Sequence, residues 1–333
     1  MVVGTPLLEV EDLAISFPQE RGWVQVLDDV RLRLHRGETV GLVGESGSGK
    51  TVTAMTAMGL IGAAGAKVLR GSVRLDGREL LGLSETEWRA VRGRRMAMIF
   101  QQPTRALNPA FTVGQQIAEA VRLHLGLSRA DAYKRAVEAL DRVHIPNARE
   151  RAKDYPFAFS GGMAQRAMIA MALAGEPDVL IADEPTTALD VTVQARILEL
   201  LKEVQRDTNI GMLFITHDLG VIAQVCDRVS VFYAGQIVEE APLDRLLAHP
   251  THPYTAGLLA SVPRPGQHRR LSSIDGTIPD FMHLPSGCRF HPRCAHAVHG
   301  RCDVTPIALE EHAAGTARCV RADELSLDGV EQR

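Results

Sequence analysis

A glycine-rich loop, residues 44–51, limits what this chain can fold into more than any other feature of the sequence. It reads GESGSGKT and matches the pattern G-x-x-x-x-G-K-[ST]. An apolar segment, residues 39–43, precedes the loop, and a helical pattern, residues 52–60, follows it. In this setting the glycines allow consecutive backbone N–H groups to face a chain of phosphates, and the helix N-terminus adds partial positive charge. The loop therefore predicts an α/β domain that binds a nucleoside triphosphate.

The loop residues have distinct expected roles. Lys50 should contact the β- and γ-phosphate oxygens, and the Thr51 hydroxyl should bind Mg²⁺. The nucleotide-binding residues expected here are Gly44, Glu45, Ser46, Gly47, Ser48, Gly49, Lys50 and Thr51. The competing interpretation is a glycine-rich turn that binds nothing, and the strand and helix on either side argue against it.

A second segment, residues 179–184, supplies two adjacent carboxylates. Its apolar strand ends in Asp183 and Glu184, at the sheet edge where α/β proteins bind ligands. We expect Asp183 to hold Mg²⁺ through a water molecule and Glu184 to polarise the attacking water as a general base. The alternative is a pair of solvated acids at a strand end. Together the two motifs predict a P-loop nucleoside triphosphatase.

Composition excludes several other classes of protein. The chain has 333 residues, is 45% hydrophobic and 23% charged, and carries a formal net charge of -3. A nucleic-acid binder would show a basic excess, so nucleic acid is not an expected partner. No apolar run reaches the roughly 20 residues needed to cross a bilayer, and the N-terminus lacks the pattern of a signal peptide. We expect a soluble protein of the cytosol.

Short apolar runs alternate with helical patterns from residue 7 to about residue 235, which predicts an α/β sheet domain. The expected strands are residues 8–11, taken as an edge strand, 39–43, 72–75, 96–100, 179–182, 212–215 and 229–233. Helical patterns dominate between residues 109 and 154, which predicts a helical insertion. Beyond Pro242 the composition shifts toward Pro, His, Arg and Cys, so we place a domain boundary near residue 241.

Further motifs carry a resemblance to the ATP-binding cassette family. The segment SGGMAQR, residues 160–166, resembles the family's signature, and it precedes the carboxylate strand by one short helix. Gln101 resembles the Q-loop glutamine, Ala188–Leu189–Asp190 the D-loop, and His217 the switch histidine. Phe17 stands where the family has an aromatic residue that stacks on adenine. In isolation a histidine after a strand is usually structural and a glutamine is usually a surface residue, but here these residues all occur in the family's order.

The resemblance implies a fold and a role for each site residue. The fold would be α/β, with a RecA-like P-loop core, an antiparallel β subdomain, a helical subdomain at about residues 105–165, and a small irregular Cys-rich extension at residues 242–333. Gln101 would reach Mg²⁺ and the attacking water, and His217 the γ-phosphate. The residues that would complete the pocket of an opposite cassette are Ser160, Gly161, Gly162, Gln165 and Asp190.

Within the family the resemblance is closest to the ATPases of dipeptide and oligopeptide importers. It rests on residues 45–51, 99–103, 161–163, 182–192 and the segment THPYT at 251–255. It implies ATP hydrolysis coupled to peptide import, with a second cassette subunit in a heterodimer, two membrane permeases and an extracytoplasmic peptide-binding protein as partners. The chain would lie on the cytoplasmic face of the inner membrane as a peripheral subunit. A nickel importer of the same branch is an alternative, and a non-transport cassette ATPase is a remote one.

Four cysteines crowd the last fifth of the chain in the spacing C-x5-C-x7-C-x16-C. They are Cys288, Cys294, Cys302 and Cys319. In a reduced chain, four thiolates suit a [4Fe-4S] cluster or zinc, and the spacing alone does not choose between them. The resemblance to the peptide-importer branch implies the iron–sulfur cluster. Zinc, with His291, His296 and His299 as substitute ligands, and unligated thiols remain the alternatives.

Overall fold

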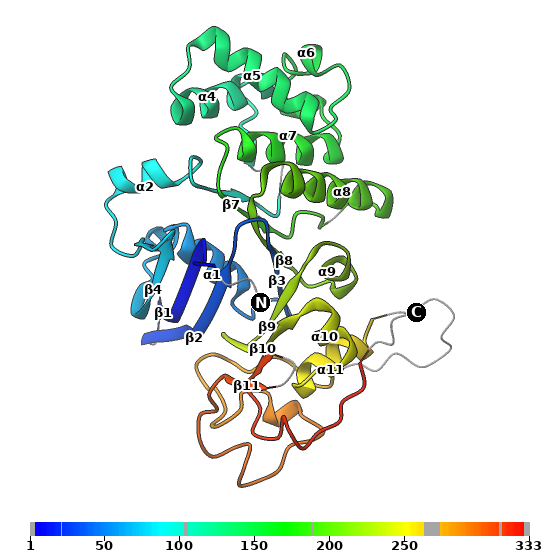
Figure 1. The fold of residues 1–333 in the computed structure, drawn as a ribbon. Helices are drawn as coiled ribbons and strands as arrows, with labels where there is room; N and C mark the ends of the chain where they lie inside the picture. The colour runs from blue at the N-terminus through cyan, green and yellow to red at the C-terminus, as the bar shows by residue number, and fades with distance from the viewer. Residues whose placement is uncertain are drawn as a thin grey trace. The chain divides into compact units, whose positions relative to one another are not determined.

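The computed structural model describes residues 4–20, 22–102, 106–187, 189–262, 274–312 and 315–329, and these form two compact units (Figure 1). The first unit is built from Met1–Leu7, Leu34–Glu38 and Gly82–Ile215. The second is built from Leu8–Arg33, Thr39–Leu81 and Thr216–Arg333. In the part of the chain that the structure describes, no helix is both long and apolar enough to cross a membrane.

The second unit contains a mixed sheet in the order β11-β12-β10-β9-β3. Strand β3 (Thr39–Val43) lies parallel to β9 (Arg228–Tyr233). The sheet continues by antiparallel pairing through β10 (Gln236–Pro242), β12 (Gly315–Ala317) and β11 (Glu310–His312). Every residue of β3 is buried, which explains its continuous apolar sequence. Two strands from the end of the chain thus extend the sheet that supports the glycine-rich loop.

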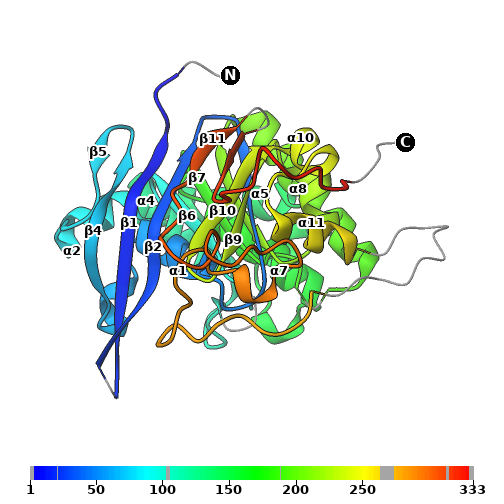
Figure 2. The ribbon, with the colours of Figure 1, turned by 90° about the horizontal axis from the view of Figure 1, so that it is seen from below.

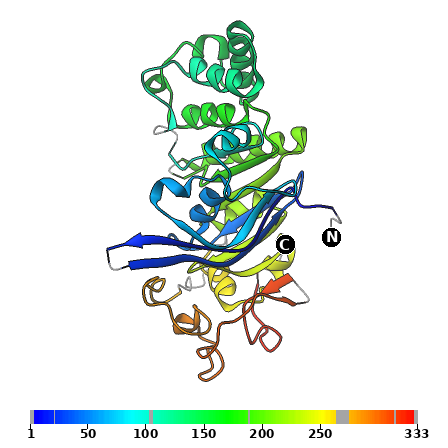
Figure 3. The same ribbon diagram turned by 90° about the vertical axis from the view of Figure 1, so that its left-hand side faces the viewer.

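An antiparallel sheet in the order β2-β1-β4-β5 completes the strands of the second unit. Figures 2 and 3 show β1 (Leu8–Gln19) and β2 (Gly22–Leu34) running side by side as a long ribbon. Strand β4 (Lys67–Leu75) turns at Asp76–Gly77 into β5 (Arg78–Glu79), so the strand expected at residues 72–75 is present as the end of β4. The expectation of an edge strand at residues 8–11 is wrong, because β1 lies between β2 and β4.

Strand β2 was not among the predicted strands, and its backbone explains why. Its buried residues, Val24, Leu27, Val30, Leu32 and Leu34, are spaced by three at first and then by two. Asp29 has φ 50°, so the alternation of the strand is interrupted there. The three-residue spacing before this point imitates a helix.

Short helices cover the second unit's mixed sheet. Helix α1 follows the glycine-rich loop, and α10 and α11 follow strand β10 (Figure 1). The helical segments are α1 (Lys50–Ala57), η1 (Ile61–Ala64), α9 (Leu219–Val225), α10 (Leu243–Ala248), α11 (Pro253–Ala260) and η3 (His291–Arg293). The side chain of His252 caps α11 by accepting a hydrogen bond from the Tyr254 N–H, at 3.1 Å.

The first unit is built on three parallel strands in the order β8-β7-β6. They are β6 (Met96–Ile99), β7 (Val179–Asp183) and β8 (Gly211–Thr216). Ile99 is level with Ala182, and Asp183 is level with Ile215, so the carboxyl ends of all three strands meet at one edge. All residues of these strands are buried.

The first unit also contains helices, and the start and the end of α4 show how the sequence sets their bounds. Thr112 and Gln115 form a capping box at α4, and Gly126 ends that helix in a left-handed conformation. Helices α4 and α5 pack on each other and on α7 (Figure 1), so the predicted helical insertion is present. The helical segments are α2 (Glu85–Val91), α4 (Val113–Leu125), α5 (Arg129–Arg142), α6 (Ala148–Arg151), η2 (Pro156–Ala158), α7 (Gly161–Leu173) and α8 (Val191–Thr208).

Candidate nucleotide-binding site

The glycine-rich loop connects β3 to α1 in the second unit, and two of its glycines cannot be replaced by a residue with a side chain. Gly44 has φ +153°, and a Cβ there would lie 2.1 Å from the carbonyl oxygen of Phe232. Gly49 has φ +112°, and its Cβ would lie 2.7 Å from a methyl carbon of Leu27. The loop can therefore curl over the end of β3 only because these positions lack a side chain. Its tip, Ser46 and Gly47, is exposed.

Lys50 organises the interior of this loop. Its side chain is 5% exposed, and Nζ donates hydrogen bonds to the carbonyl oxygens of Gly44 and Glu45, each at 2.8 Å, and to Oγ of Ser48 at 3.3 Å. The same residue begins α1, so a buried ammonium group and the N-terminus of a helix lie together. Both attract anions, which fits the binding of a phosphate chain.

Two further predicted residues belong to this unit. Phe17 is half-buried near the end of β1. His217 is exposed and comes directly after β8, ahead of Asp218, whose carboxylate caps α9 by accepting from the Gly220 N–H at 2.7 Å. A strand end followed at once by a helix cap fixes the backbone at His217.

The first unit contains the two predicted carboxylates, Asp183 and Glu184. Asp183 ends β7 and is 6% exposed. Glu184 follows in a left-handed conformation, φ 47°, and its N–H donates to the carbonyl oxygen of Ile215 at 2.9 Å. Its Oε2 accepts hydrogen bonds from Nε2 of Gln101 at 2.6 Å and from Oγ1 of Thr187 at 2.8 Å. A non-glycine residue held at positive φ is strained, and such strain is typical of functional positions.

The predicted signature lies at the N-terminus of α7 in the same unit. Ser160 caps the helix by accepting a hydrogen bond from the Met163 N–H at 3.3 Å. Gly161 is exposed, and a Cβ there would meet nothing within 4 Å, whereas one at Gly162 would lie 2.8 Å from a methyl carbon of Val193. Gln165 is 1% exposed, and its Nε2 has no hydrogen-bond partner among the described residues.

Asp190 caps the next helix, α8, by accepting from the Val193 N–H at 2.9 Å. Its neighbour in the predicted D-loop, Ala188, lies outside the described residues. Three helices, α7, α8 and α9, therefore begin at a predicted site residue or its neighbour. At the N-terminus of a helix the first backbone N–H groups have no partner within the helix, so they can bind other groups.

The structure brings predicted residues together in two groups. Gln101 and Glu184 meet in the first unit, while Gly44, Glu45, Ser48 and Lys50 meet in the second. Sequence reasoning missed Thr187, which shares the Glu184 carboxylate, and also missed the residues that contact Glu45. The run of two threonines after the acidic pair was a signal for the first. The second set comes from the far end of the chain, and no local pattern could reveal it.

The four C-terminal cysteines line one cavity of the second unit, together with His252, Phe290 and His291. Burial raises the pKa of the Cys288 thiol to about 12 and also raises the pKa of Cys294 and Cys319. Nevertheless, in the described ranges no three His, Cys, Asp or Glu side chains are arranged so that they could hold a metal ion. Neither the expected cluster nor the zinc alternative is supported by this geometry.

Comparison with known proteins identifies the family. Residues 27–187 match the model of the ABC transporter family, and residues 238–302 match that of the oligopeptide/dipeptide transporter C-terminal region. A putative peptide import ATP-binding protein of Brucella abortus is 50% identical over 293 residues, 88% of each chain. The oligopeptide transport ATP-binding protein AppD of Bacillus subtilis is 45% identical over 328 residues, 98% of this chain and 99% of that one. The chain belongs to the ATP-binding proteins of ABC transporters.

Solved structures agree with this assignment. A dimeric ATP-binding cassette in a post-hydrolysis state, bound to ADP and phosphate, matches with a TM-score of 0.62 and 26% identity, over 71% of this chain and 98% of that chain. CbiO1 from Clostridium perfringens, part of an ABC transporter complex, matches with a TM-score of 0.63 and 26% identity, over 73% and 91% of the two chains. The protein is an ABC ATPase that uses ATP and Mg²⁺, and the expected cassette fold is confirmed.

Proposed function

We propose that this ABC ATPase powers the import of di- and oligopeptides. The observation that carries the proposal is the match of residues 238–302 to the C-terminal region of oligopeptide and dipeptide transporters, in a chain whose residues 27–187 match the ABC transporter family. The peptide-import relatives match along almost their whole length, which supports the same cargo here. A nickel importer of the same branch is the alternative that the experiment below separates.

The residues of the second unit would bind the nucleotide. Lys50, whose ammonium group now holds the loop carbonyls of Gly44 and Glu45, would turn to the β- and γ-phosphates. Thr51 would bind Mg²⁺, and Phe17 would stack on adenine. His217 would contact the γ-phosphate from the end of β8.

The residues of the first unit would align the attacking water. Glu184 is the proposed general base, and its carboxylate already accepts hydrogen bonds from Gln101 and Thr187. Asp183, at the end of β7, would hold Mg²⁺ through water, and Gln101 would contact both the ion and the attacking water. Alignment and electrostatic stabilisation are the main requirements of phosphoryl transfer.

A second cassette would complete each site. Ser160, Gly161, Gly162 and Gln165 would contact the γ-phosphate held by the partner, because the N-terminus of α7 presents backbone N–H groups there. Asp190 would touch the partner's phosphate loop. Since one chain would supply half of each site, the isolated monomer should hydrolyse ATP slowly.

We further propose the transporter's organisation. Residues 1–241 would form the nucleotide-binding domain, with its helical subdomain at about 105–165, and residues 242–333 the C-terminal extension. The partners would be a different cassette subunit, two permeases and an extracytoplasmic peptide-binding protein. The chain would work at the cytoplasmic face of the membrane as a peripheral subunit.

The four cysteines remain candidates for an iron–sulfur cluster. What supports the proposal is the donor set alone, four cysteines that line one cavity, because the described residues form no arrangement that could hold a metal ion. A bound cluster would act as a structural or redox group. Anaerobically purified protein should then contain about four irons per chain and absorb near ~400 nm. Colourless protein with one zinc per chain would contradict this proposal.

The cargo is tested with the assembled transporter. The chain, its partner cassette and the permeases are reconstituted in proteoliposomes with the peptide-binding protein, and ATP-dependent uptake of a labelled dipeptide is compared with uptake of nickel ions. Peptide uptake that requires ATP and disappears with Glu184→Gln would support the proposal. Nickel uptake without peptide uptake would contradict it.

A further inference from the structure

Arg293, at the end of η3 in the C-terminal extension, binds directly to the phosphate loop. Its Nη1 donates to both carboxylate oxygens of Glu45, at 3.0 and 3.2 Å, and to the Tyr233 hydroxyl at 3.3 Å. The side chain of Arg293 is 7% exposed and that of Glu45 is 30% exposed. The Nε atom of Arg293 donates to the carbonyl oxygen of Asp275 at 2.8 Å, which fixes the guanidinium in place. This is a partly buried, charge-assisted contact rather than a flexible surface pair.

The extension also holds the backbone of Glu45. The Glu45 N–H donates to the hydroxyl of Tyr254, a buried residue of α11, at 3.0 Å. The Tyr254 ring packs against Tyr233 and Phe290, with ring centroids 4.7 and 5.2 Å apart. Both the carboxylate and the peptide group of one phosphate-loop residue are therefore set by residues from beyond the sheet domain.

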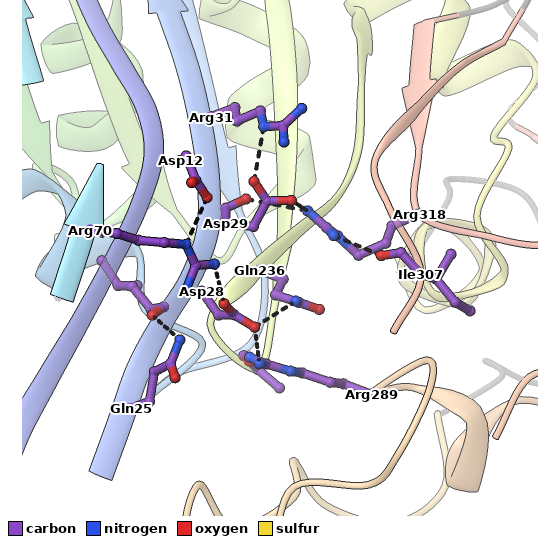
Figure 4. A network of polar contacts seen from close by, with 12 residues as sticks. Asp12, Gln25, Asp28, Asp29, Arg31, Arg70, Gln236, Arg289, Ile307 and Arg318 are labelled. Carbon is purple, nitrogen blue, oxygen red and sulfur yellow. Dashed lines mark hydrogen bonds and ion pairs between the residues drawn. The ribbon is translucent and has the colours of Figure 1, made fainter. Parts of the chain in front are cut away.

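Two other arginines anchor the extension independently of this contact (Figure 4). Arg289 donates to Oδ2 of Asp28 and to the carbonyl oxygen of Ala234, each at 2.6 Å. Arg318 donates to Oδ2 of Asp29 at 3.1 Å and to the carbonyl oxygen of Ile237 at 3.1 Å. Because these contacts hold the extension on β2 and β10, a change at Arg293 alone should leave the extension docked.

The contact between Arg293 and Glu45 should affect nucleotide binding through its charges. Glu45 places a carboxylate inside a loop that receives the several negative charges of ATP. Such a carboxylate repels the phosphates unless a cation neutralises it, and Arg293 is the cation that contacts both of its oxygens. The same pair keeps the carboxylate on the side of Arg293 and Tyr233.

We propose that Arg293 is a positioning residue of the ATP site, which neutralises Glu45 and holds it clear of the phosphates. The affinity of the loop for ATP thereby depends on the docked C-terminal extension. The inference rests on ATP binding by this cassette and is independent of the cargo. Arg293 itself does not contact the nucleotide in this arrangement, because its fork is occupied by Glu45, Tyr233 and the 274–276 backbone.

The test compares variants of the full-length chain by titration with ATP and by steady-state hydrolysis. Arg293→Gln keeps amide donors but loses the charge, and it should weaken ATP binding about tenfold and raise KM similarly, with kcat changed less than about twofold. Arg293→Lys keeps the charge but loses the guanidinium fork, so its loss of ATP affinity should be smaller than that of Arg293→Gln but not zero. Arg301→Ala, which removes an exposed arginine of the same extension paired with Glu324, is the matched control and should leave ATP affinity unchanged.

The decisive comparison repeats Arg293→Gln in a Glu45→Gln background. If the role is electrostatic, the loss of affinity caused by Arg293→Gln should shrink from about tenfold to less than about twofold, because no carboxylate remains to be neutralised. The same loss in both backgrounds, or no loss with Glu45 present, would overturn the inference. An equally large loss in Arg293→Lys would also contradict it. Absence of ATP binding by the wild-type chain would instead refute the cassette's activity itself.

Discussion

Gln101 donates a hydrogen bond from Nε2 to Oε2 of Glu184, over 2.6 Å. The two residues each follow one of two neighbouring parallel strands, β6 and β7, by one or two positions. The bond therefore follows from strand register rather than from chance contact of long side chains. It points the carboxylate of Glu184 at the edge where α/β sheets bind ligands.

Replacement of Glu184 by glutamine should stop hydrolysis without stopping ATP binding. The amide cannot accept a proton from water, so the rate of phosphate release should fall by about 10²-fold or more. ATP should remain bound, and ATP-bound dimers should accumulate in size-exclusion chromatography. The measurement is phosphate release together with the nucleotide content of the purified dimer.

The matched control for this change is Glu199→Gln, which makes the same substitution on an exposed position of α8. Its hydrolysis rate should stay within about twofold of the wild type, as is usual for exposed positions. Wild-type hydrolysis by Glu184→Gln would show that the proposed base is wrong.

Lys50→Ala should abolish tight ATP binding. Nζ of Lys50 is buried and the ammonium group is placed among loop carbonyls, so its loss removes a charge-assisted contact to the phosphates, worth about tenfold or more in affinity. Isothermal titration with ATP measures the effect. Lys202→Ala, on an exposed position of α8, removes the same charge and should bind ATP as the wild type does. Unchanged ATP affinity in Lys50→Ala would place the phosphates elsewhere.

His252 should make the protein less stable in acid. Burial, with the charge of Arg318, lowers the pKa of this imidazole from 6.5 to about 3, so the folded chain keeps it neutral while the unfolded chain protonates it. Stability is complete above about pH 6.5 and falls as the pH drops toward about 3. The expected slope is at most about 1.4 kcal/mol per pH unit in the free energy of unfolding.

The comparison variant is His252→Asn, because asparagine can still cap α11 but does not titrate. Burial raises the pKa of the neighbouring Glu239, which acts in the opposite direction, so the difference between the two proteins at each pH isolates the histidine. Urea unfolding between pH 4 and 7.5 provides the measurement. Identical pH slopes for wild type and variant would contradict a buried neutral imidazole.

The sequence predicted strands and loops whose signals are local, and it missed features that depend on distant partners. The apolar runs of β3, β7 and β8 are each fully buried, so their composition alone revealed them. The contacts of Arg289, Arg293 and Arg318 join residues more than 200 positions apart, and no periodicity encodes them. Strands β11 and β12 were missed for the same reason, since each has only three residues and is defined by its pairing, β12 with β10 and β11 with β12.

Asp28→Asn should weaken the contact of the C-terminal extension with β2. It should also make the free energy of unfolding depend less on pH in the acid range. Burial alone would raise the pKa of Asp28, but the hydrogen bond from Arg70 and the charges of Arg289 and Arg318 hold it below its ordinary value of 3.8. A depressed pKa contributes stability above pH 3.8 that is lost as the pH falls through the folded-state pKa. At pH 7 the variant should therefore be less stable by about 1.5 kcal/mol, the contribution of a charged hydrogen bond.

The difference should shrink toward zero in strong acid, and urea unfolding at pH 7 and pH 2.5 measures it, with Asp207→Asn as the exposed control. A deficit that is equal at both pH values would show that lost packing, not the carboxylate's charge, destabilises the variant.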